Sequence, residues 1–153
     1  MRIIVPKEIA NKLFSALKKA EDREIKGACF ARFVEDDVYE IEEVYISHKI
    51  GSNFFSNLVI DYRYKRFEKA YYKKNNYDFE KHNYIGDWHS HPLFDCIPSN
   101  YDINELEEEL EKSNANFLVQ LIVKISFQKL IGRCFFLSKG SKTQQECILE
   151  IIE

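Results

Sequence analysis

The chain has 153 residues, of which 45% are hydrophobic and 31% are charged, a composition that suits one globular domain with its own core. Its aromatic content of 14% excludes the class of disordered chains, which are poor in aromatic residues. The 22 basic and 25 acidic residues are intermixed and give a formal net charge of -3, which argues against a nucleic-acid-binding protein. We therefore expect a single domain over residues 1–153.

The first third of the chain changes from helical to extended periodicity. Residues 3–5 predict a short strand, and Pro6 suits the first turn of a helix. Apolar residues then recur on one helical face, at Ile9, Leu13, Ala16, Leu17 and Ala20. From Gly27 to Ser47, the runs GACFARFV and VYEIEEVYIS flank the acidic turn 35–37, a pattern that predicts a hairpin of two strands.

A second helix is predicted after a break at Gly51-Ser52-Asn53. Helical spacing links Ile60, Tyr64, Phe67 and Tyr71, and the polar stretch 73–76 ends the segment. Basic residues also cluster between positions 63 and 81 among these aromatics. The pattern favours an amphipathic helix with a solvated lysine face, and the alternative is an electropositive, aromatic contact face for a partner.

The second half of the chain alternates strands and helices. Residues 84–89 predict a strand that runs into a proline-bounded loop, and Ser99 suits the N-cap of the acidic helix INELEEELEKS. Residues 117–125 and 131–137 predict two further strands, whereas 144–152 fits either a helix or a strand. The order of elements predicts an α/β fold in which one mixed sheet is sandwiched by helices.

The sequence also bears on the compartment. The segment MRIIVPKEIANKLF lacks the features of a signal peptide, and no apolar run reaches membrane-spanning length. The scattered cysteines form no C-x-x-C pair, so neither a disulfide framework nor a cysteine zinc site is indicated for Cys29, Cys96, Cys134 and Cys147. We expect a soluble cytoplasmic protein with reduced thiols.

The residues with metal-binding chemistry are His89, His91 and Asp102. The two histidines flank one residue at the end of a predicted strand, so that their side chains point to the same side. The loop from His91 to Asp102 is long enough to return a carboxylate to the same point. Two histidines and one aspartate make a zinc set with a fourth position open, as in catalytic sites.

The string HSHPLFDCIPSNYD resembles the JAMM signature of the JAB/MPN+ metallopeptidases, H-x-H followed by ten residues and Asp, with Ser three positions before that Asp. Glu24-Ile25-Lys26-Gly27 is similar to the family's upstream Glu-x-x-Gly. The order of elements also agrees with the family's JAB/MPN, cytidine-deaminase-like fold. The resemblance thus covers essentially the whole chain.

This resemblance implies a role for each motif residue. His89, His91 and Asp102 would bind one Zn²⁺ per chain, and Glu24 would be the general base that takes a proton from the attacking water. Ser99 would donate to the tetrahedral oxyanion, beside its role as a helix cap. Zinc lowers the pKa of bound water toward about 7, so this set suits amide hydrolysis.

Four further residues are interpreted as lying outside the set of zinc ligands and catalytic residues. Trp88 should face away from His89 and pack in the core. Cys96 lies in the ligand loop, where it is either a simple thiol or a redox-sensitive inhibitor of the metal site. His48 and His82 have no ligand spacing and are interpreted as ordinary polar residues.

The resemblance further implies a substrate class. Family members cleave amide bonds at the C-terminal tail of ubiquitin or ubiquitin-like proteins, and the stand-alone domain with its GDWHSHP context resembles prokaryotic members encoded beside ubiquitin-activating-like and conjugating-like enzymes, including antiphage (CBASS-like) operons. We expect a ubiquitin-like or conjugated protein tail as substrate, no nucleic acid or membrane partner, and a monomer or homodimer. The alternatives are processing of a sulfur-carrier protein tail in cysteine or thiamine biosynthesis, and a non-catalytic MPN scaffold.

Overall fold

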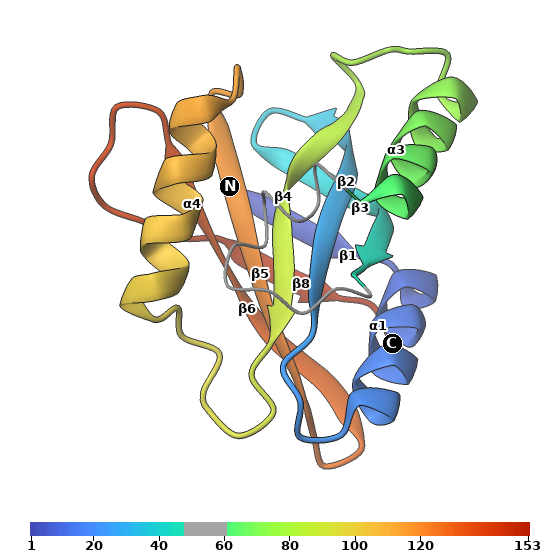
Figure 1. The fold of residues 1–153 in the computed structure, drawn as a ribbon, viewed down its shortest axis with the longest axis vertical. Helices are drawn as coiled ribbons and strands as arrows, with labels where there is room; N and C mark the ends of the chain where they lie inside the picture. The colour runs from blue at the N-terminus through green and yellow to red at the C-terminus, as the bar shows by residue number, and fades with distance from the viewer. Residues whose placement is uncertain (48–60) are drawn as a thin grey trace.

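The computed structural model describes residues 1–47 and 61–153, which form one eight-stranded mixed sheet and three helices (Figure 1). The helices are α1 (Lys7–Ala20), α3 (Tyr62–Lys74) and α4 (Asn100–Lys112). The strands are β1 (Arg2–Val5), β2 (Lys26–Glu35), β3 (Val38–Ile46), β4 (His82–Ser90), β5 (Phe117–Ser126), β6 (Lys129–Ser138), β7 (Gln145–Glu146) and β8 (Ile148–Ile151). These elements confirm the predicted hairpin, the predicted helices and the mixed α/β class. Ile60, the break at 51–53 and His48 lie outside the described residues.

The strands lie in the order β7-β6-β5-β4-β2-β3-β1-β8. β4 pairs in parallel with β5 and antiparallel with β2, which makes the sheet mixed. The C-terminal segment, which the sequence left open between helix and strand, is extended. Its first part, β7, pairs with β6, and its second part, β8, pairs with β1, so this segment links the two edges of the sheet.

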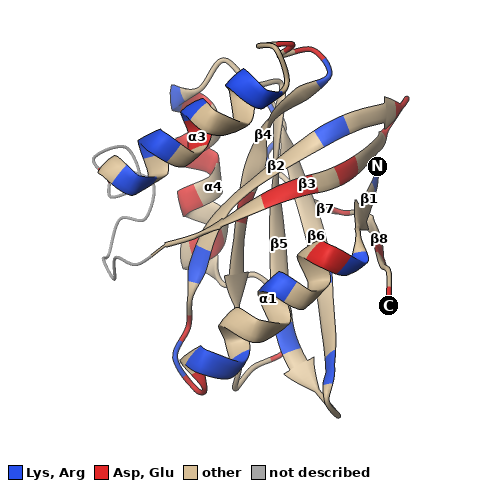
Figure 2. Cartoon of the chain, turned by 90° about the vertical axis from the view of Figure 1, so that its right-hand side faces the viewer, with Lys and Arg blue, Asp and Glu red and all other residues tan. Residues whose placement is uncertain are grey.

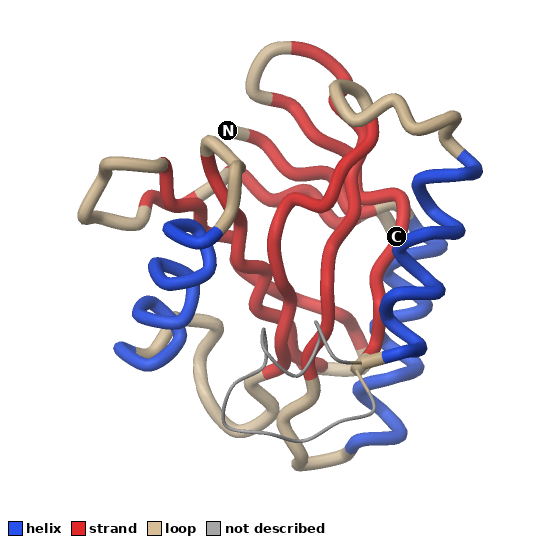
Figure 3. Tube along the Cα trace, turned by 45° about the horizontal axis from the view of Figure 1, so that its top comes forward, coloured by secondary structure: helices blue, strands red, loops and turns tan. Residues whose placement is uncertain are grey.

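Helices cover both faces of the sheet (Figures 1 and 3). On β2, Cys29 and Ala31 belong to the core cluster beneath α1, whereas Ala28 and Phe30 pack with aromatic residues of α3. α4 covers the same face as α3 through Leu106 and Leu110. Because both faces are buried, the central strands read as continuous apolar runs.

Helix α3 is amphipathic. Tyr64 and Tyr71 are buried against Phe30, while Arg63 and Lys65 are exposed. Figure 2 shows basic residues spread along this helix and along α1. The favoured interpretation of the basic, aromatic segment is therefore confirmed, and a role in partner contact stays a prediction.

A β-bulge at the middle of β4 sets which side chains face α4. Tyr84 pairs with Phe30 and Gly86 pairs with Cys29, so Ile85 is an extra residue. The bulge leaves Tyr84 and His89 on the face covered by α3 and α4, and Ile85 and Trp88 in the core beneath α1. Trp88 is fully buried and its Nε1 donates to the Tyr45 carbonyl at 2.8 Å, which confirms its predicted packing role.

Gly86 is required at this bulge for two reasons. Its φ of 148° lies in a region that residues with a Cβ rarely adopt, and a Cβ there would lie 1.9 Å from the Val119 carbonyl oxygen of β5.

None of the described helices is both long enough and apolar enough to span a bilayer.

We expect Gly86→Ala to lower the free energy of unfolding by about 3 kcal/mol or more, because it adds backbone strain to a clash within the sheet. Urea denaturation followed by circular dichroism measures this change. Gly140→Ala is the matched control, since Gly140 also has positive φ, at 85°, but a Cβ would meet nothing within 4 Å. Equal losses in the two variants would contradict the account of the bulge.

Candidate metal centre

The two histidines of the motif converge at the end of β4. His89 Nε2 lies 3.1 Å from His91 Nε2, and both side chains are largely buried. His91 Nδ1 donates to the Asp95 carbonyl at 2.9 Å, which orients the ring so that Nε2 lies toward His89. The predicted convergence of His89 and His91 is thus present in the structure.

Asp102 reaches the same point from the first turn of α4. Its Oδ2 lies 3.4 Å from His89 Nε2 and 3.5 Å from His91 Nε2. The same oxygen accepts from the Ser99 amide at 2.8 Å, and the Asp102 amide donates to Ser99 Oγ at 3.1 Å. This reciprocal pair is a capping box, so the start of the helix holds the carboxylate in place.

The three side chains fit a metal ion. A tetrahedral zinc ion with bonds of about 2.0–2.1 Å separates its ligand atoms by about 3.3 Å. The three separations of 3.1, 3.4 and 3.5 Å agree with that value. His89, His91 and Asp102 could therefore hold a metal ion and leave a fourth position open.

The pKa values of His89 and Asp102 are shifted by each other and by their neighbours. Burial alone lowers the pKa of His89, but the hydrogen bond to Asp102 and the carboxylate of Asp87 outweigh it and raise the pKa to about 9. Burial raises the pKa of Asp102, but His89 and Ser99 outweigh it and hold the pKa well below its usual value. A proton on His89 and a metal ion compete for the same nitrogen.

Glu24 lies in the same pocket as the ligands. This pocket has a volume of about 80 Å³, and its lining includes Glu24, His89 and Asp102. The pairing of Lys26 with His89 brings the segment before β2 to this point. Ser90, the residue between the histidines, accepts from the Ile25 amide at 2.9 Å and donates its own amide to the Ile25 carbonyl at 2.8 Å, which fixes the backbone next to Glu24.

The remaining candidates are placed as follows. Ser99 is the exposed N-cap of α4, and because its Oγ accepts from Asp102, the hydroxyl proton is still available to a ligand. Its oxyanion role stays a prediction. Cys96 is buried against Ile122 and Phe135, and burial raises the pKa of its thiol, so packing is the favoured interpretation. His82 contacts Glu42 at 2.7 Å, as expected for an ordinary polar residue.

Two residues of the site were missed by the sequence analysis. Asp87 is buried, and its Oδ1 lies 3.8 Å from His89 Nδ1. Gln120 on β5 pairs with Asp87 and donates its Nε2 to the Asp102 carbonyl at 3.2 Å. Both residues could have been identified from the sequence, because Asp87 shares a face with His89 by strand alternation and Gln120 is the polar residue that interrupts the apolar run FLVQLIVKI.

Comparisons with known proteins agree with this architecture. The profile of the prokaryotic homologs of the JAB domain matches residues 6–134. The solution structure of protein DSY2949 from Desulfitobacterium hafniense is similar with a TM-score of 0.67 and 22% identity, over 99% of this chain and 93% of that one. The crystal structure of AF2198, a JAB1/MPN domain protein from Archaeoglobus fulgidus, is similar with a TM-score of 0.52 and 16% identity, over 100% of both chains. No curated protein matches the chain. At these identities the two structures support the fold alone.

We expect zinc binding to weaken as the pH falls below about 9, because His89 is protonated below its raised pKa and must lose that proton to bind the ion. Displacement of one proton predicts a change in the apparent Kd of about tenfold per pH unit. Competition with a chromophoric chelator between pH 6 and pH 8 measures it. His82→Gln should keep this slope, and an apparent Kd independent of pH would contradict the prediction.

Proposed function

The chain belongs to the family of prokaryotic homologs of the JAB domain, and we propose that it is a zinc-dependent peptidase that hydrolyses the amide bond at the C-terminal tail of a ubiquitin-like or conjugated protein. One observation carries the proposal. The three potential ligand atoms lie within 4.8 Å of one another, and Glu24 lines the pocket into which His89 and Asp102 face.

In the proposed reaction, the residues of the chain supply proton transfer and a hydrogen bond to the oxyanion. Bound zinc would lower the pKa of water and polarise the substrate carbonyl. Glu24, on the rim of the pocket, accepts the proton of the attacking water and returns it to the leaving amine. The Ser99 hydroxyl, held at the start of α4, donates toward the oxyanion.

The converging ligand set supports this proposal over a non-catalytic scaffold. A domain that serves only as an interaction module has no need of two imidazoles and a carboxylate converging within hydrogen-bond range. The orientation of His91 by the Asp95 carbonyl and of Asp102 by the capping box also favours a metal function, because metal ligands need such supporting contacts. The proposed substrate follows from family membership, and activating-like and conjugating-like enzymes are its proposed partners.

We expect Glu24→Gln to reduce kcat by about 10²- to 10⁴-fold, since the amide cannot accept a proton, while zinc content and thermal stability stay unchanged. His91→Ala should lose the metal as well as the activity. The assay is cleavage of a fusion bearing the tail of a ubiquitin-like protein, with and without chelator, alongside zinc measured by elemental analysis.

The control is Glu21→Gln, which alters an exposed acid three residues away and should leave kcat unchanged. Full activity of Glu24→Gln would rule out its role as the base. A zinc-free wild-type protein that cleaves no tail would favour the scaffold alternative instead.

A further inference from the structure

A second pocket is lined by residues of α3, α4 and the first half of β4, elements that Figure 1 labels. Its volume is about 450 Å³, and its walls include three tyrosines, Tyr64, Tyr72 and Tyr84, and two carboxylates, Glu68 and Glu109. The metal ligands are not among the described residues that line it. We call it the tyrosine pocket.

The tyrosine hydroxyls donate to neighbouring residues. Tyr64 donates to Glu68 Oε2 at 3.0 Å, Tyr72 donates to Asn83 Oδ1 at 2.9 Å, and Tyr84 donates to Glu109 Oε1. The three rings also pack around Phe30, with centroid separations of 6.3, 6.1 and 5.7 Å. With their protons already used, these groups offer a ligand chiefly oxygen acceptors and aromatic faces.

Glu109 is the unusual member of the pocket. Its side chain is only 2% exposed, and Oε2 has no hydrogen-bond partner among the described residues. Buried carboxylates in native proteins are normally paired or hydrogen-bonded on both oxygens. Lys65, the cationic residue in the described lining, is exposed to solvent. The wall of the pocket therefore contains a buried carboxylate oxygen that no described residue pairs.

We propose that the tyrosine pocket binds the ammonium or guanidinium group of a lysine or arginine side chain in the polypeptide substrate, an inference that rests on the proposed peptidase function. Both groups carry only donors, which complements a lining of acceptors. Both also bind the faces of aromatic rings, as the three tyrosines allow. An apolar or anionic side chain would leave the Glu109 oxygen unpaired, and a neutral donor would leave the charge of the buried carboxylate unbalanced.

The spacing of the two sites limits where this residue lies in the substrate. Glu109 follows Asp102 by seven residues on α4, which is about 10 Å along a helix. Tyr84 precedes His89 by five residues on β4, which is at most about 16 Å along a strand. An extended peptide advances about 3.3 Å per residue, so the cationic residue lies about three to five residues from the cleaved bond.

The pH dependence of binding follows from the surroundings of Glu109. Burial, and then the charge of Asp87, raise the pKa of the Glu109 carboxyl to about 8. A bound cation favours the ionised carboxylate, so binding should tighten as the pH rises toward 8. Among the described residues, the other titratable or charged groups around this carboxyl include Tyr84 on β4, Glu105 on α4, and Tyr64, Lys65, Glu68 and Tyr72 on α3.

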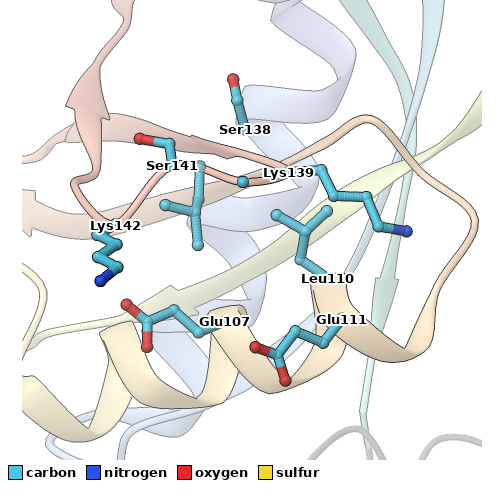
Figure 4. Close-up of a pocket in the computed structure, with 9 residues that line it drawn as sticks. Glu107, Leu110, Glu111, Ser138, Lys139, Ser141 and Lys142 are labelled. Carbon is cyan, nitrogen blue, oxygen red and sulfur yellow. The ribbon is translucent and has the colours of Figure 1, made fainter.

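Another hollow on α4 supplies a matched control. It is lined by Glu107 and Glu111 of α4 and by Lys139 and Lys142 of the loop after β6, so both acids and cations contribute to its walls (Figure 4). Glu111 is exposed on the same helix, two residues from Glu109. Glu111→Gln removes one carboxylate from α4 without changing the tyrosine pocket.

The test is titration of the full-length protein with N-acetylarginine amide and with its neutral isostere, N-acetylcitrulline amide, followed by NMR of the tyrosine ring signals. We expect saturable shifts of Tyr64, Tyr72 and Tyr84 with the arginine compound alone, at least tenfold weaker binding in Glu109→Gln, and unchanged binding in Glu111→Gln. Equal binding of the two compounds would overturn the proposal. Thermal melts verify folding, and if Glu109→Gln does not fold, Glu68→Gln must show the loss.

Cleavage assays separate this proposal from the peptidase function. Moving one lysine along a neutral tail should lower KM only at three to five residues from the cleaved bond. Glu109→Gln should abolish that preference, whereas Glu111→Gln should keep both the preference and kcat. Selective binding of the arginine compound without any tail cleavage would support the pocket and contradict the peptidase. Cleavage without lysine preference and without selective binding would contradict the pocket alone.

Discussion

The antiparallel pairing of β2 with β4 is the constraint on which the candidate site depends. It sets Lys26 opposite His89 and brings Glu24, far away in the sequence, into the pocket that His89 lines. Two hydrogen bonds between Ser90 and Ile25 close the pairing: the Ser90 hydroxyl oxygen accepts from the Ile25 amide, and the Ser90 amide donates to the Ile25 carbonyl. The residue between the two imidazoles thus holds the segment that carries the proposed base, so one strand pairing positions the two histidines and the base, whereas α4 positions Asp102.

The bulge at Ile85 and Gly86 determines which face of β4 carries polar chemistry. If β4 alternated strictly with no bulge at Ile85, Tyr84 and His89, which are five residues apart, would lie on opposite faces, and one of them would enter the apolar core beneath α1. With it, both lie beneath α3 and α4, while Ile85 and Trp88 pack with Leu13 and its neighbours. The metal centre and the tyrosine pocket share a face for this reason.

The sequence predicted those features that depend on local spacing. The H-x-H pair and the capping box of Ser99 and Asp102 each lie within a few residues, so periodicity and capping rules were sufficient. Asp87 and Gln120 were missed because their burial results from the parallel pairing of β4 with β5, which joins residues distant in sequence. Glu109 was missed because the side chains of an acidic helix are expected to be solvated, and the sequence alone does not show which turn of the helix packs on the sheet.

Helix α4 couples the two polar sites. Its first turn holds Asp102, where the capping box and the positive end of the helix dipole both favour a carboxylate. Its third turn holds Glu109, where no such compensation exists and burial raises the pKa instead. Leu106 and Leu110 anchor the helix against Leu118 and Leu137, so the packing energy of these apolar residues keeps Glu109 buried. The same helix therefore contributes Asp102, a carboxylate that the fold stabilises, and Glu109, a carboxylate whose burial in the ionised form is unfavourable unless a cation binds. This difference is expected if a cationic ligand completes the tyrosine pocket.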